Sequence, residues 1–73
     1  MIRVLVVDDH ELVRSGITRM LADNPDIEVI GQAPSGEDAI DFVRQERPDI
    51  VLMDIRMPGI GGLEATRRIL RID

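Results

Sequence analysis

The stretch Val4-Leu5-Val6-Val7-Asp8-Asp9 decides the fold, because a continuous apolar run ends there in two acids. A second run, Ile50-Val51-Leu52-Met53, ends in the same way at Asp54. Runs rich in Val, Leu and Ile are typical of strands that are buried on both faces, and such strands belong to parallel sheets. Open parallel sheets bind ligands at the carboxyl ends of their strands, so these acids mark a candidate site.

The composition is that of one folded domain. With 73 residues, 44% of them hydrophobic and 32% charged, the chain is too short for a second domain. It has no cysteine, so any metal must be bound by oxygen atoms or by the single His10. A net charge of -5 argues against a nucleic-acid surface, and all nine basic residues are arginine. No apolar stretch is long enough to span a membrane, and we expect a cytoplasmic location.

Strand and helix patterns alternate along the whole chain. In chain order we expect a strand at 3–7, a helix through 12–21, a strand at 27–32, a helix that follows Ser35, a strand at 49–53 and a helix that carries Leu63, Thr66, Ile69 and Leu70 on one side. The helix positions assigned to the core are Val13, Ile17, Met20, Leu21, Ile40 and Val43. Ser35-Gly36-Glu37-Asp38 resembles a capping box, in which Ser35 accepts a hydrogen bond from the first helical turn.

This order predicts a (βα)3 portion of a flavodoxin-like, doubly wound α/β fold. Because crossovers between parallel strands are right-handed, two units with helices on opposite faces must step in opposite directions from the first strand. The predicted strand order is therefore 2-1-3, with the first and third strands as neighbours. Asp8, Asp9 and Asp54 then converge at the switch point between them.

Three carboxylates in one place repel one another, and a bound cation relieves this repulsion. Mg²⁺ prefers hard oxygen ligands and uses one or two carboxylates together with waters and a phosphate oxygen. A carboxylate such as that of Asp54 can attack phosphorus and form an aspartyl phosphate. The acids therefore predict a site for Mg²⁺ and a phosphoryl group.

At this point the residues resemble a known family. Residues 4–10, residues 49–54 and Met57-Pro58-Gly59 followed by Gly62 are similar to the receiver domain of two-component response regulators. Asp8-Asp9-His10 together with residues 11–14 and 57–67 resembles the NarL/FixJ class, and within it the GacA/UvrY type of global regulators. The resemblance extends from Met1 to Asp73.

The resemblance implies a role for each site residue. Asp54 is the phosphoacceptor, Asp9 and Asp54 are direct Mg²⁺ ligands, Asp8 reaches the metal through water, and the backbone carbonyl of Arg56 supplies another oxygen. The phosphodonor is a sensor histidine kinase, and the chain is no enzyme beyond its own phosphorylation. DNA binding in this class belongs to a carboxy-terminal domain that is absent here.

The resemblance also implies that residues 1–73 are the amino-terminal part of a receiver. A whole receiver has five strands, and its second half carries a Ser or Thr and a Lys that complete the phosphoryl site. This chain contains no lysine. We therefore expect it not to switch by itself. We also expect it to self-associate, through the exposed edge of the third strand or through exposed faces, or else to fold incompletely.

Simpler explanations exist for several of these residues. Asp8-Asp9 by itself is a common helix cap, and His10 fits the start of the first helix as a partly exposed residue outside the chemistry. The glycines Gly59, Gly61 and Gly62 fit turn geometry better than a phosphate loop. The arginines Arg67, Arg68 and Arg71 fit a solvated helix face, on which Glu64 pairs with Arg67 or Arg68.

Two other function classes share the strand-end aspartate. An Mg²⁺-dependent aspartyl phosphohydrolase of the haloacid dehalogenase type has a second acid two residues after the nucleophile, where this chain has Arg56. The chain could alternatively be a self-associating structural or interaction fragment without phosphotransfer.

Overall fold

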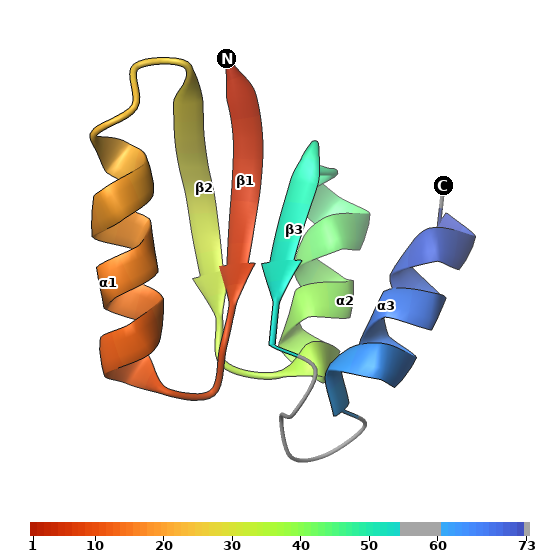
Figure 1. Ribbon diagram of the computed structural model, residues 1–73. Coiled ribbons are helices and arrows are strands. Elements are labelled where there is room, and N and C mark those ends of the chain that lie inside the picture. The colour runs from red at the N-terminus through yellow and green to blue at the C-terminus, as the bar shows by residue number, and fades with distance from the viewer. Residues whose placement is uncertain (55–60, 73) are drawn as a thin grey trace.

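Three parallel strands and three helices alternate along the chain in the computed structural model, which describes residues 1–54 and 61–72 (Figure 1). The elements are β1 (Ile2–Val7), α1 (Glu11–Ala22), β2 (Ile27–Ala33), α2 (Gly36–Glu46), β3 (Ile50–Met53) and α3 (Gly61–Ile72). The strand order is β2-β1-β3, so the predicted 2-1-3 arrangement is confirmed. Within this described part, every helix is too short or too polar to cross a membrane.

The central strand β1 is buried because it pairs with a neighbour on each side. Val4, Leu5, Val6 and Val7 are each at most 2% exposed. β1 runs parallel to both β2 and β3, and its last residue, Val7, is level with the last residue of each neighbour. The three strands therefore end at one edge of the sheet.

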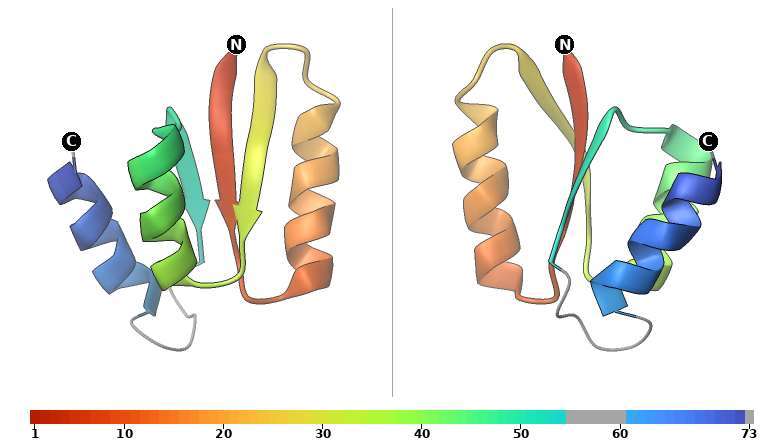
Figure 2. Two further views of the ribbon diagram at one scale, coloured as in Figure 1. Left: turned by 180° about the vertical axis from the view of Figure 1, so that it is seen from behind. Right: turned by 45° about the vertical axis from the view of Figure 1, so that its right-hand side comes forward.

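Helices cover both faces of the sheet, α1 on one side and α2 with α3 on the other (Figure 2). The core between the sheet and α2 consists of Leu5, Val7, Ala33, Ala39 and Val43. Ile40 and Val43 are only 6% and 7% exposed, as the helical spacing predicted. The predicted cap of α2 is confirmed, since the backbone N–H of Asp38 donates to Ser35 Oγ at 3.1 Å.

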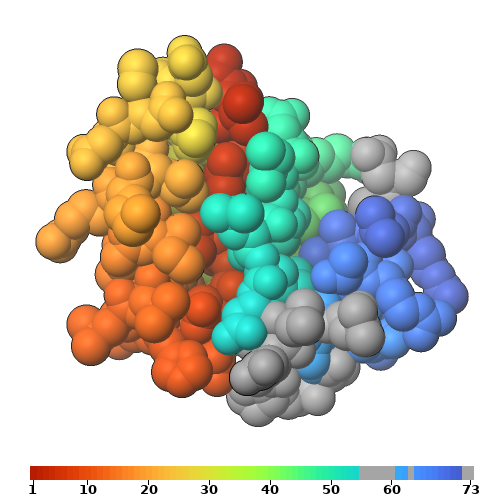
Figure 3. Space-filling model, in the orientation of Figure 1, coloured from red at the N-terminus to blue at the C-terminus, as the bar shows by residue number. Residues whose placement is uncertain are grey.

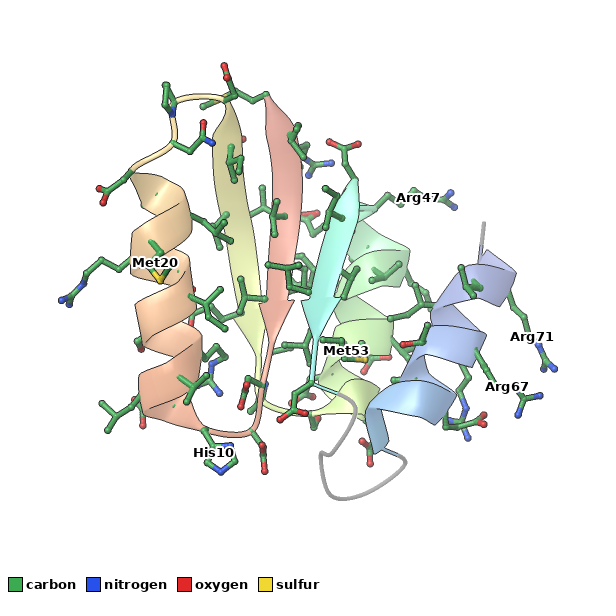
Figure 4. All side chains as sticks on the ribbon, in the orientation of Figure 1. His10, Met20, Arg47, Met53, Arg67 and Arg71 are labelled. Carbon is green, nitrogen blue, oxygen red and sulfur yellow. The ribbon has the colours of Figure 1, made fainter. Side chains whose placement is uncertain are left out.

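The prediction for α1 was wrong at two positions. Val13 is 49% exposed and Met20 is 76% exposed, and Met20 lies on the outer side of the helix (Figure 4). Ile17 and Leu21 are half-buried. The reason is that α1 packs mainly against β2, at the side of the sheet, so the sheet covers only part of its apolar stripe.

The pairing of β1 with β3 is fixed at its start by Arg3 and Asp49. The Arg3 N–H donates to Asp49 Oδ2 at 2.9 Å, and the Asp49 N–H donates to the Arg3 carbonyl oxygen at 2.8 Å. The Arg3 guanidinium also donates to the carbonyl oxygens of Glu46 and Arg47 at the end of α2. These bonds set the level at which β3 begins, and so the level at which it ends.

Helix α3 carries the expected solvated charges. Glu64 pairs with Arg67 at 3.1 Å and with Arg68 at 3.0 Å. The hydrogen bond from Arg68 and the charge of Arg67 hold the pKa of Glu64 below its usual value. Because that pKa is lowered by folding, the pairing favours the folded state above the ordinary pKa of 4.5, and this effect is lost as the pH falls through the lowered value. Since Glu64 is only partly buried, solvent screens the interaction.

Strand β2 approaches α2 closely at Gly31. A Cβ atom at Gly31 would lie 2.5 Å from two ring atoms of Phe42, which packs against the core. The pairing of β1 with β2 also shifts register next to this point, between Val4 and Leu5. A side chain at position 31 would therefore have to displace the aromatic ring above it.

We expect Gly31→Ala to lower the free energy of unfolding by about 1–3 kcal/mol, because the added methyl group must displace the Phe42 ring. The matched control is Gly16→Ala, at an exposed position of α1 where a Cβ would meet nothing within 4 Å. There the substitution should stabilise the protein by roughly 0.5–1 kcal/mol through helix propensity. Urea denaturation measures both changes, and equal effects of the two substitutions would contradict the prediction.

Candidate functional site

The register of the sheet places Asp8 beside Asp54. Val7 is paired with Met53, and the Asp54 N–H donates to the Val7 carbonyl oxygen at 3.1 Å, one residue beyond the end of β3. On the other side, the Asp8 N–H donates to the Ala33 carbonyl oxygen at 3.1 Å. The backbone ladder thus continues into the loops and positions the first acid of each.

Four potential metal ligands meet at this edge of the sheet. Asp8, Asp9, His10 and Asp54 each offer one ligand atom, and these atoms all lie within 4.8 Å of one another. The structure therefore brings together the three acids that the sequence predicted to converge. Arg56, whose carbonyl the sequence analysis added to the site, lies outside the described residues.

Asp8 is buried and held at several atoms. Its Oδ1 accepts a hydrogen bond from the His10 backbone N–H at 2.8 Å. Its carbonyl oxygen accepts one from Arg14 Nη1 at 2.7 Å, while Arg14 Nε donates to Gln32 Oε1 at 3.1 Å. Arg14 therefore ties α1 and β2 to the loop that carries the acids.

The sequence analysis missed this role of Arg14. The signal available was its position, since Arg14 is the fourth residue of α1, near the positive end of the helix dipole. A cation is disfavoured there unless a negative or carbonyl partner compensates. The backbone carbonyl oxygen of Asp8, six residues earlier, is this partner.

The environment of Asp9 Oδ1 indicates whether a cation fits the acidic cluster. Its Oδ1 is buried and makes no hydrogen bond within the part of the chain that the structure describes, although His10 Nδ1 lies 3.0 Å away. A buried carboxylate oxygen without a hydrogen bond is costly, and metal coordination removes that cost. The donors nearby are mainly carboxylate oxygens, so the residues fit Mg²⁺.

His10 lies at the start of α1, as predicted, and its side chain is 69% exposed. Figure 4 shows its ring at the edge of the molecule where β1 and β3 end. The ring nitrogen Nδ1 is 3.2 Å from Asp8 Oδ1 and 3.0 Å from Asp9 Oδ1. The sequence analysis did not foresee that the ring would turn toward both acids.

A separate groove lies between α2, β3 and α3 and does not contribute to this site. Its volume is about 520 Å³. It is lined by Val43, Arg47, Pro48, Asp49, Val51, Met53, Thr66, Ile69 and Leu70. None of these residues belongs to the acidic cluster.

A doubly wound parallel sheet with acids at the ends of its two adjacent strands defines a flavodoxin-like domain with an acidic site at the switch point. Comparison with known families matches residues 4–73 to the response regulator receiver domain. The chain belongs to this family, as the sequence resemblance indicated.

Individual relatives agree with this assignment. The response regulator GacA of Pseudomonas viridiflava is 68% identical over 71 residues, which cover 97% of this chain and 33% of GacA. The response regulator UvrY of Escherichia coli K12 is 62% identical with the same coverage. A crystal structure of a LuxR-family two-component response regulator from Aurantimonas sp. SI85-9A1 matches with a TM-score of 0.92 and 42% identity, over 97% of this chain and 51% of that one. The chain thus spans about a third of the length of the curated relatives that it matches.

The geometry predicts different effects on Mg²⁺ affinity at neighbouring positions. Asp9→Ala should weaken Mg²⁺ binding at least about tenfold, the scale on which even outer-sphere partners of metals act. His10→Ala should weaken Mg²⁺ binding much less, because Mg²⁺ prefers oxygen to imidazole nitrogen. Isothermal titration calorimetry measures both affinities, and equal losses would overturn this assignment of the ligands.

Proposed function

We propose that the chain acts as the phosphoacceptor receiver module of a two-component response regulator, with Asp54 accepting a phosphoryl group from a sensor histidine kinase. The observation that carries this proposal is the position of Asp54 next to Asp8 and Asp9. Oδ1 of Asp9 is buried and makes no hydrogen bond in the described part of the chain. Membership of the receiver family supports it, because receivers in general bind Mg²⁺ at an acidic pocket and interact with histidine kinases or phosphotransfer domains.

The residues of the chain would divide the work as follows. Asp9 and Asp54 would hold Mg²⁺ directly, Asp8 would reach it through water, and the Arg56 carbonyl would add a further oxygen. When bound, Mg²⁺ supplies positive charge that stabilises the transferring phosphoryl group. A carboxylate oxygen of Asp54 attacks phosphorus, the bond between phosphorus and the donor histidine nitrogen breaks, and an acyl phosphate forms on Asp54.

We further propose that residues 1–73 form the amino-terminal part of a receiver and that they do not switch unaided. Without lysine, the chain has no side-chain ammonium group to bind a phosphoryl oxygen of phosphorylated Asp54. Transcriptional regulation through DNA would require a carboxy-terminal domain outside these residues. The chain would act as a phosphoacceptor and catalyse no reaction other than its own phosphorylation.

Phosphorylation can be tested with acetyl phosphate and Mg²⁺, with intact mass as the measurement. We expect a mass gain of one phosphoryl group in the wild type and none in Asp54→Ala, because that variant lacks the acceptor oxygen. The control Asp41→Ala removes an exposed acid of α2 and should retain the gain. Catalytic release of phosphate would favour a phosphohydrolase instead, and no reaction would favour an interaction fragment.

Self-association through the edge of β3 remains a prediction. β3 is an edge strand, and Ile50 and Leu52 are 44% and 40% exposed on it. Figure 3 shows β3, in cyan, uncovered on the face in view. Open backbone groups and apolar side chains at a sheet edge favour pairing with another chain.

Sedimentation velocity at micromolar concentration should therefore show dimers or larger species, and Leu52→Lys should shift them toward monomer by placing a charge at the contact. A wild-type chain that sediments as a monomer and melts cooperatively would refute this prediction.

A further inference from the structure

The presence of histidine at position 10 is not explained by helix capping. His10 is the N-cap residue of α1, but its side chain makes no capping hydrogen bond. Ser, Thr, Asp and Asn are the side chains that stabilise this position. The His10 ring instead places Nδ1 close to Asp8 and Asp9.

The distances from the His10 ring nitrogen to the two neighbouring acids match those between adjacent ligands of one ion. Neighbouring ligands of an octahedral ion with bonds of about 2.1 Å lie about 3 Å apart, and opposite ligands lie about 4.2 Å apart. His10 Nδ1 lies 3.0 Å from Asp9 Oδ1 and 3.2 Å from Asp8 Oδ1. All four donors, including that of Asp54, lie within 4.8 Å of one another. The ring nitrogen thus occupies the position of a neighbouring ligand.

The same distances also suit an ion pair between the ring and the two acids, and Nδ1 lies within hydrogen-bond distance of Asp8 Oδ1. Two observations favour a ligand. Asp9 Oδ1 makes no hydrogen bond among the described residues despite its closeness to Nδ1. The side chain of His10 is 69% exposed, so solvent weakens an ion pair between the ring and the acids.

We propose that His10 contributes an imidazole nitrogen to the acidic cluster and that the site thereby favours late first-row transition metals such as Ni²⁺ and Cu²⁺ over Mg²⁺. Imidazole binds these ions well, whereas Mg²⁺ gains little from a nitrogen ligand. The inference rests on the metal site of the proposed function. It adds a nitrogen ligand to the oxygen ligands of that site, and this nitrogen strengthens the preference for Ni²⁺ and Cu²⁺ beyond that of carboxylates alone.

The first test compares Ni²⁺ and Mg²⁺ affinities by calorimetry. We expect His10→Ala to weaken Ni²⁺ binding about tenfold or more while it changes Mg²⁺ binding little. His10→Asn is the matched control, because asparagine restores a polar, capping side chain without an imidazole. It should leave Ni²⁺ binding as weak as in His10→Ala, whereas a purely structural role of the side chain would allow asparagine to rescue it.

The second test observes the ligand directly. In the electron spin echo of bound Cu²⁺, the remote nitrogen of a coordinated imidazole produces a recognisable modulation. The chain contains one histidine, so this modulation reports on His10 alone. We expect it in the wild type and not in His10→Ala.

The outcomes separate this inference from the proposed function. Equal losses of Ni²⁺ and Mg²⁺ affinity in His10→Ala, rescue by His10→Asn, or no imidazole modulation would overturn the role of His10 and leave the Mg²⁺ site intact. A wild-type chain that binds no Mg²⁺, or Mg²⁺ binding that Asp9→Ala does not weaken, would overturn both.

Discussion

The parallel pairing of β1 with both of its neighbours is the constraint on which the rest of the structure depends. It buries Val4 to Val7 completely and brings the ends of three strands to one edge. Because a parallel register cannot slip by one residue without turning every side chain to the other face, the level of Asp8 relative to Asp54 is fixed by packing far from the site. The packing of the apolar core thus determines which acids meet at this edge of the sheet.

The neighbouring acids at this edge, Asp8 and Asp9, differ in the hydrogen bonds that they accept. Asp8 is supported from the protein side, by the His10 backbone and by Arg14 on its carbonyl. Among the described residues, the buried Oδ1 of Asp9 accepts no hydrogen bond, and His10 Nδ1 lies 3.0 Å from it. This difference agrees with the proposed roles, in which Asp8 stabilises the loop and Asp9 binds the cation.

Much of this arrangement was predictable from the sequence because it follows from short-range patterns and general rules. Apolar runs that end in acids predicted where the strands end. The handedness of the crossovers predicted the strand order that places Asp8 beside Asp54. The exposure of Met20 was not predictable, because helical periodicity shows which face is apolar but not how much of it a sheet covers. The contacts of Arg14 and of the His10 ring depend on side-chain directions set by the folded loop, which spacing alone does not encode.

Arg14 has a thermodynamic consequence for the whole domain. Its guanidinium joins α1 to the carbonyl of Asp8 and to Gln32 of β2, so the placement of the helix and the shape of the acidic loop share one set of hydrogen bonds. Leu12 and Met20 expose apolar surface on the same helix, 88% and 76% respectively. A molecule that docks on that surface and shifts Arg14 would change the affinity for a cation at the acids. By linkage, the cation would change the affinity for that molecule by the same factor, and the two binding events would be coupled.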